Sequence, residues 1–68
     1  MVNTDKLKEQ MASRGVTVEK LSRKIGMDDS TFYRKLSAQG KTFTLEQADA
    51  IKRELNLDKE TAEAIFFS

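Results

Sequence analysis

The stretch that most constrains the fold is residues 17–37, TVEKLSRKIGMDDSTFYRKLS. Thr17 can cap a helix through its hydroxyl, and Leu21 and Ile25 then lie one turn apart on one face. Gly26 follows as the residue that readily adopts positive φ, so it is expected to end this helix and turn the chain sharply.

A second helix is predicted directly after this turn, over residues 29–38. Asp28 is placed to cap it, while Phe32 and Leu36 lie one turn apart and form its buried face. The remaining positions give it a polar outward face that can hydrogen-bond. That face consists of Asp29, Ser30, Tyr33, Arg34 and Ser37.

Two helices joined by a short turn that contains glycine form a helix-turn-helix, whose second helix enters the major groove of DNA. The stretch resembles the Cro and repressor family of phage helix-turn-helix proteins. The matching residues are Thr17, Leu21, Ser22, Ile25, Gly26, Ser30, Thr31, Phe32 and Arg34. The resemblance implies an all-α, compact five-helix, lambda-repressor-like domain over residues 1–68. It also implies a sequence-specific transcriptional regulator, most similar to a small Cro-like bacteriophage repressor.

Three further helices are expected around this pair. The first begins at Asn3 or Thr4, buries Leu7 and Met11, and ends at Gly15.

The fourth helix should begin at the capping box formed by Thr44 and Gln47 and end before Asn56. Its apolar stripe is predicted to be Leu45, Ala48, Ile51 and Leu55.

Asp58 should cap a fifth helix that buries Ala62, Ile65 and Phe66. Phe67 falls off this stripe and could either fold back or serve an interface. The core is predicted to comprise Leu7, Leu21, Ile25, Phe32, Leu36, Leu45, Ile51 and Leu55.

Composition narrows the function. The chain has no cysteine and no histidine, which removes disulfides, thiol nucleophiles and imidazole chemistry and argues against an enzyme, a metal site or a cofactor. No small-molecule ligand or membrane contact is expected, and a cytoplasmic protein is predicted. Charge is asymmetric: residues 1–41 carry nine Lys or Arg against five Asp or Glu, whereas residues 42–68 carry three against six. The N-terminal part could therefore face a polyanion.

The predicted partner is double-stranded operator DNA. Base contacts are predicted from the N-terminal turns of the helix over residues 29–38, namely Asp29, Ser30, Thr31, Tyr33 and Arg34. For Asp29 a first-turn dipole role is an equal alternative. Backbone contacts are predicted from Thr17, Val18, Ser37, Gln39, Lys41 and Thr42.

One recognition helix reads only a few base pairs, so a homodimer on DNA is expected, with Phe66 and Phe67 at its interface. An alternative function stays open. The helix-turn-helix could instead serve a modulator, anti-repressor or antitoxin that binds another regulator rather than DNA.

Overall fold

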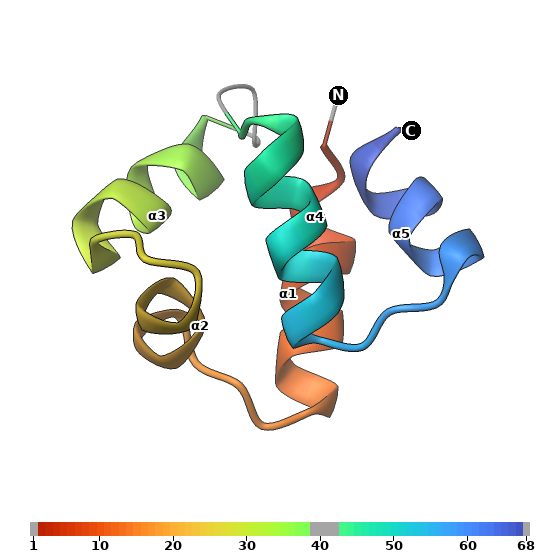
Figure 1. The fold of residues 1–68 in the computed structure, drawn as a ribbon, viewed down its shortest axis with the longest axis horizontal. Helices are drawn as coiled ribbons and strands as arrows, with labels where there is room; N and C mark the ends of the chain where they lie inside the picture. The colour runs from red at the N-terminus through yellow and green to blue at the C-terminus, as the bar shows by residue number, and fades with distance from the viewer. Residues whose placement is uncertain (1, 39–42, 68) are drawn as a thin grey trace.

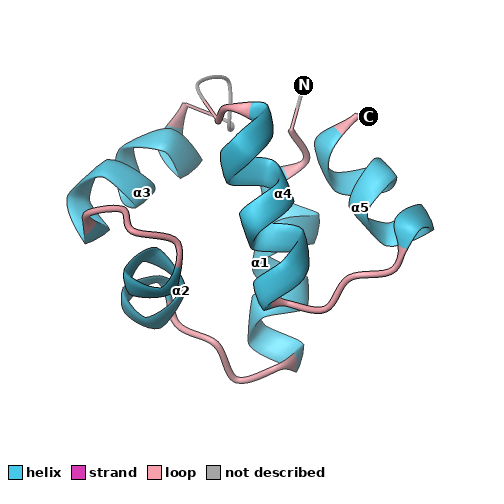
Figure 2. Cartoon of the chain, viewed as in Figure 1, coloured by secondary structure: helices cyan, strands magenta, loops and turns pink. Residues whose placement is uncertain are grey.

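The computed structural model describes residues 2–38 and 43–67, which form five helices (Figure 1). The helices are α1 (Thr4–Ser13), α2 (Val18–Lys24), α3 (Asp29–Ser37), α4 (Leu45–Glu54) and α5 (Lys59–Phe66). Helices and loops account for all the described residues, as Figure 2 shows, so the predicted all-α fold of five helices is confirmed. In Figure 1, α2 and α3 lie on one side, α1 and α4 run through the middle, and α5 lies on the other side.

Four of the five helices begin at a side-chain cap. Asn3, Thr17 and Asp58 each accept a hydrogen bond from the amide three residues later. Thr44 and Gln47 form the predicted capping box, with both bonds at 3.0 Å. The prediction for Asp28 was wrong in one respect: it occupies the N-cap position of α3, but only its backbone carbonyl bonds into the helix, and its side chain makes no capping bond.

Three helices end in the same hydrogen-bonded turn. Gly15 and Gly26 have φ of 66° and 72°, and Asn56 has φ of 53°. In each case the amide of the following residue donates to a carbonyl five residues back, the pattern of a Schellman motif. These bonds are Val16 to Met11 at 2.9 Å, Met27 to Ser22 at 2.8 Å and Leu57 to Lys52 at 3.0 Å. The apolar residue after each turn packs on the core, so each turn also directs the next helix inward.

The core is one apolar cluster to which every helix contributes. Its members are Leu7, Met11, Leu21, Phe32, Leu36, Ile51, Leu55, Leu57, Ala62, Ile65 and Phe66. Two predicted core residues differ: Ile25 is only half-buried, and Leu45 is 75% exposed. Leu45 lies on the same helical face as Asp49 and Lys52, four and seven residues later, and this face lines a groove that is open to solvent.

The two ends of α1 are tied to other helices by hydrogen bonds to backbone carbonyls. The Asn3 amide donates to the Ile65 carbonyl at 2.6 Å, which joins the start of α1 to α5. Arg14, at the end of α1, donates from Nε to the Leu55 carbonyl at the end of α4, also at 2.6 Å. These bonds fix both ends of α1, while α2 and α3 lie on the side of the molecule away from α5 (Figure 1).

Candidate nucleic-acid interface

The outward face of α3 is polar and open to solvent. Asp29, Ser30, Tyr33, Arg34 and Ser37 are exposed, as predicted, while Thr31 is half-buried. Phe32 and Leu36 are buried at 0% and 7% exposure, so they fix which side of α3 points outward. The arrangement therefore presents the polar side of α3 to solvent.

Arg34 is the cation best placed on this face. Its guanidinium makes no hydrogen bond or ion pair with any residue in 2–38 or 43–67, so its planar donors are available. A guanidinium can donate two parallel hydrogen bonds to the N7 and O6 atoms of guanine. Lys35, the next residue, is half-buried, and its ammonium lies 5.9 Å from the ring centroid of Phe43. The two cations therefore occupy different sides of α3.

Asp29 contacts α2 directly. Its Oδ1 accepts a hydrogen bond of 2.6 Å from the Oγ of Ser22, a residue with no exposed surface. In the sequence, Ser22 stood out only as one of the residues that match the helix-turn-helix pattern. The structure shows a second contribution, because the Ser22 hydroxyl joins the middle of α2 to the first turn of α3.

Tyr33 also contacts α2. Its hydroxyl donates to the Oε2 of Glu19 at 2.9 Å, and its side chain remains 48% exposed. The hydrogen bond to the Glu19 carboxylate, with smaller contributions from desolvation and from the charges of Glu19 and Asp29, raises the pKa of Tyr33 above its ordinary value. Sequence reasoning missed Glu19 as a site residue. Glu19 and Tyr33 are fourteen positions apart in the sequence, a separation that gives no local spacing signal for this contact.

The predicted phosphate contacts Thr17 and Val18 lie at the start of α2. Thr17 is exposed and its hydroxyl accepts from the Lys20 amide at 3.1 Å, and Val18 is half-buried at the first helical position. The side chains of the three cationic residues of α2 are exposed. They are Lys20, Arg23 and Lys24. Three of the predicted backbone contacts, Gln39, Lys41 and Thr42, lie outside the described residues.

The C-terminal residues that were predicted at a dimer interface differ in burial. Phe66 is 8% exposed and belongs to the core, whereas Phe67 is 68% exposed. Both line a shallow groove between α4 and α5, and Leu45 lies at its rim. The exposed apolar area of this groove therefore comes mainly from Leu45 and Phe67. Sequence reasoning placed Leu45 in the core and so missed it as a residue of this surface.

Two other kinds of site find no support in the described part of the chain. Residues 2–38 and 43–67 hold no group of three or more carboxylates, histidines or cysteines that could bind a metal ion. Over the same ranges no helix has the length and apolar character needed to cross a bilayer.

Together, the sharp turn at Gly26, the buried Phe32 and Leu36 and the exposed polar face of α3 define a helix-turn-helix DNA-binding protein. A family model described as the Cro/C1-type HTH DNA-binding domain matches residues 6–61, which is most of the chain. The chain belongs to this family, and DNA is its partner. No curated protein and no solved structure matches the chain.

Proposed function

We propose that the protein is a sequence-specific repressor of the Cro type, from a bacteriophage, that reads the major groove with α3. The observation that carries the proposal is the exposed guanidinium of Arg34, which has no partner among residues 2–38 and 43–67, on an otherwise polar helix face. On this proposal the whole chain acts as one DNA-binding domain on an operator in the cytoplasm of a bacterial host.

The contacts divide by chemistry. Arg34 supplies a bidentate contact to guanine, and Ser30 and Thr31 add hydrogen bonds with little base preference. Tyr33 places the edge of its ring against a thymine methyl while its hydroxyl stays on Glu19. Thr17, Val18 and Ser37 at the two ends of the motif bind phosphates, together with Gln39, Lys41 and Thr42 after α3.

We also propose that the protein binds its operator as a homodimer through the groove between α4 and α5. Leu45 and Phe67 supply the exposed apolar surface, which a second copy would cover. The groove is edged by two carboxylates and two ammonium groups, so a two-fold related copy can place opposite charges together. These are Asp49 and Lys52 on α4 and Lys59 and Glu63 on α5. The two copies of α3 would then meet half-sites about 34–36 Å apart.

Replacing Arg34 tests the proposed contact to DNA. Arg34→Ala should weaken binding to the preferred duplex by about 1–3 kcal/mol and relax the preference at one base pair in each half-site. The matched control is Arg53→Ala, which removes one exposed arginine from α4, where it pairs with Asp49 at 3.2 Å. Equal losses in both variants would show that Arg34 contributes only charge, and would contradict base reading by this residue.

A further inference from the structure

We propose that Glu19 and Asp29 are positioning residues that hold α3 in one orientation on α2, and that their charges make DNA binding more selective while weakening affinity for arbitrary sequences. This inference rests on the proposed reading of the major groove by α3. On this inference, each carboxylate accepts a hydrogen bond from the neighbouring helix and does not contact a base directly.

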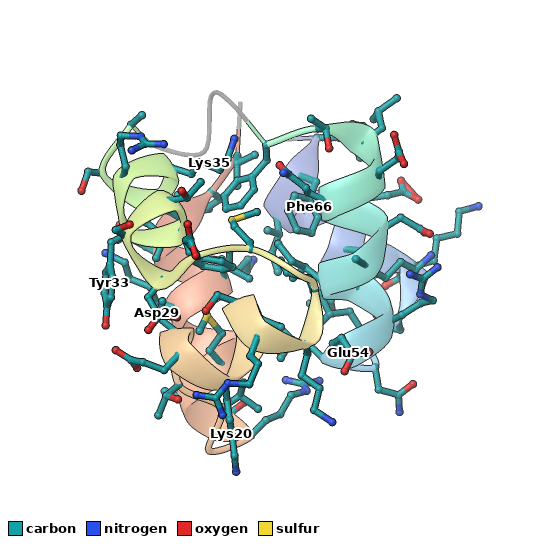
Figure 3. All side chains as sticks on the ribbon, turned by 60° about the vertical axis from the view of Figure 1, so that its left-hand side comes forward. Lys20, Asp29, Tyr33, Lys35, Glu54 and Phe66 are labelled. Carbon is teal, nitrogen blue, oxygen red and sulfur yellow. The ribbon has the colours of Figure 1, made fainter. Side chains whose placement is uncertain are left out.

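The two helices exchange hydroxyl-to-carboxylate hydrogen bonds reciprocally. Ser22 of α2 donates to Asp29 of α3 at 2.6 Å, and Tyr33 of α3 donates to Glu19 of α2 at 2.9 Å. Asp29 and Tyr33 are four residues apart, and Glu19 and Ser22 are three apart, so each pair lies on one face of its helix. Two bonds at separate levels oppose both sliding of α3 along α2 and rotation of α3 about its own axis. Figure 3 shows Asp29 and Tyr33 on the side of α3 that adjoins α2.

The bond from Ser22 is the more constrained of the two. The Ser22 hydroxyl has one proton and two neighbouring acceptors. These are the Glu19 carbonyl at 3.2 Å and Asp29 Oδ1 at 2.6 Å. The shorter contact and the ionised acceptor favour donation to Asp29. Because Ser22 has no exposed surface, water cannot replace this partner. The carboxylate of Asp29 is therefore fixed beside α2 rather than free to turn toward a base.

The charges of both carboxylates act on any DNA that approaches. Affinity for arbitrary DNA comes almost entirely from cations that neutralise phosphates, so two carboxylates on this surface weaken it. Affinity for the preferred sequence depends in addition on base contacts, which require a fixed α3. Arg34 follows Tyr33 directly, so rotation of α3 would displace its guanidinium from the base edges. Losing the carboxylates should therefore raise binding to arbitrary DNA and lower discrimination.

The pairing of Glu19 with Tyr33 can be tested without DNA. Tyr33 is the only tyrosine of the chain, and there is no tryptophan, so the ultraviolet absorbance of the phenolate reports this residue alone. In the Glu19→Ala variant the phenol should ionise at lower pH than in the wild type. Asp28→Ala, which removes a carboxylate that makes no side-chain cap bond, should leave the titration curve in place. Circular dichroism over the same pH range checks that the fold persists. Identical curves for Glu19→Ala and wild type would overturn the pairing.

Discrimination is measured as the ratio of affinities for two duplexes of equal length. One is the duplex that the wild type selects from a random library, and the other has a random sequence. Ser22→Ala, which removes only the bond, should lower this ratio about tenfold, and Asp29→Ala, which removes the bond and a charge, should lower it at least as much. The double variant should behave as Asp29→Ala alone, because the bond is already lost in that variant. The charge control is again Asp28→Ala, which removes a neighbouring carboxylate that makes no side-chain cap bond, so it should lower the ratio by less than Ser22→Ala does.

Two results would overturn the proposal, and they differ from failure of the proposed function. If Asp29→Ala changes the preferred base at one position while Ser22→Ala keeps full discrimination, Asp29 reads a base directly. If the effects of the two substitutions add in the double variant, the residues act independently. A wild-type protein with no preference for any duplex would overturn the proposed function and the claim of selectivity together. The tyrosine titration would still decide the positioning role of Glu19 in that case.

Discussion

The ring of Phe43 meets the ring of Phe32 edge to face, with centroids 5.5 Å apart and planes inclined by 69°. Phe32 lies in α3, and Phe43 directly precedes the N-cap of α4, so this contact attaches α3 to the start of α4. The ammonium of Lys35 lies 5.9 Å from the centroid of the Phe43 ring. Helix α3 is thus held by the contact of Phe32 with Phe43 on one side and by its two hydrogen bonds to α2 on another.

Replacing Phe43 should loosen this attachment. Phe43→Ala removes a half-buried ring and its edge-to-face contact, and we expect the free energy of unfolding to fall by about 2 kcal/mol. Phe43→Leu keeps most of the apolar area and should recover about half of the loss. Urea denaturation followed by circular dichroism measures both variants. Equal stability of Phe43→Ala and wild type would show that the contact contributes nothing.

Gly26 should be intolerant of a side chain because of its backbone conformation. Its φ is 72°, yet a Cβ there would meet no atom within 4 Å, so any cost comes from the backbone alone. Gly26→Ala should lower the free energy of unfolding by roughly 1–2 kcal/mol. Gly26→Asn should cost less, because asparagine adopts positive φ more readily. A thermal melt measures both variants. A lower melting temperature for Gly26→Asn than for Gly26→Ala would contradict the explanation from backbone conformation.

Arg14 joins the ends of two helices. Its Nε donates to the Leu55 carbonyl, and its guanidinium also bonds to the side chain and the carbonyl of Gln10. Arg14→Ala should destabilise the fold by about 1 kcal/mol. Arg14→Lys keeps the charge but lacks the Nε donor, so it should lose nearly as much. Full stability in the lysine variant would show that charge alone matters at this position.

Asp58 should contribute to the dependence of stability on pH. Hydrogen bonds from the amide and then the hydroxyl of Thr61 hold the pKa of Asp58 below its ordinary value. A carboxylate whose pKa is lower in the folded state stabilises the fold above its unfolded pKa, and this stabilisation is lost as pH falls through the folded pKa. Wild type should therefore lose stability below about pH 4 more steeply than Asp58→Asn, which keeps a capping oxygen without charge. Urea denaturation at neutral and acid pH gives the free energy of unfolding of both proteins. An equal loss of this free energy on acidification would contradict the contribution of Asp58.

The proposed dimer depends on two exposed apolar residues. Leu45→Lys and Phe67→Lys should each weaken assembly of two protein molecules on the selected duplex by about tenfold, because each places a charge within the covered surface. Ser13→Lys, an exposed substitution at the end of α1, is the matched control. Sedimentation of the protein–DNA complex gives the stoichiometry. Two molecules bound with undiminished affinity in both groove variants would place the interface elsewhere.

The elements that could be predicted from sequence are those with local signals. Thr17, Thr44 and Asp58 cap helices, and Gly26 turns the chain, because caps and turns involve residues only a few positions apart. Leu45 was predicted to be buried because it continues an apolar stripe. It is the first residue of α4, and its face meets no other part of the described chain that would cover it.

The contacts that hold α3 against α2 and α4 could not be predicted from local sequence signals. Phe43 lies outside any helix, so no periodicity marks it as a partner of Phe32. The bond from Ser22 to Asp29 depends on how two helices cross, and spacing along the chain does not give a crossing geometry. The outward residues of α3 were predicted correctly because they follow from the positions of Phe32 and Leu36 alone.

The most direct test of the account is the salt dependence of binding to a random duplex, followed by selection of preferred sites. If six phosphates are neutralised in the complex, the logarithm of the binding constant should fall by about 5.4 for each tenfold rise in salt. Selection should then enrich a short site repeated with two-fold symmetry. A slope near zero, or no binding even at low salt, would contradict DNA recognition through α3 and favour a function in binding another regulator.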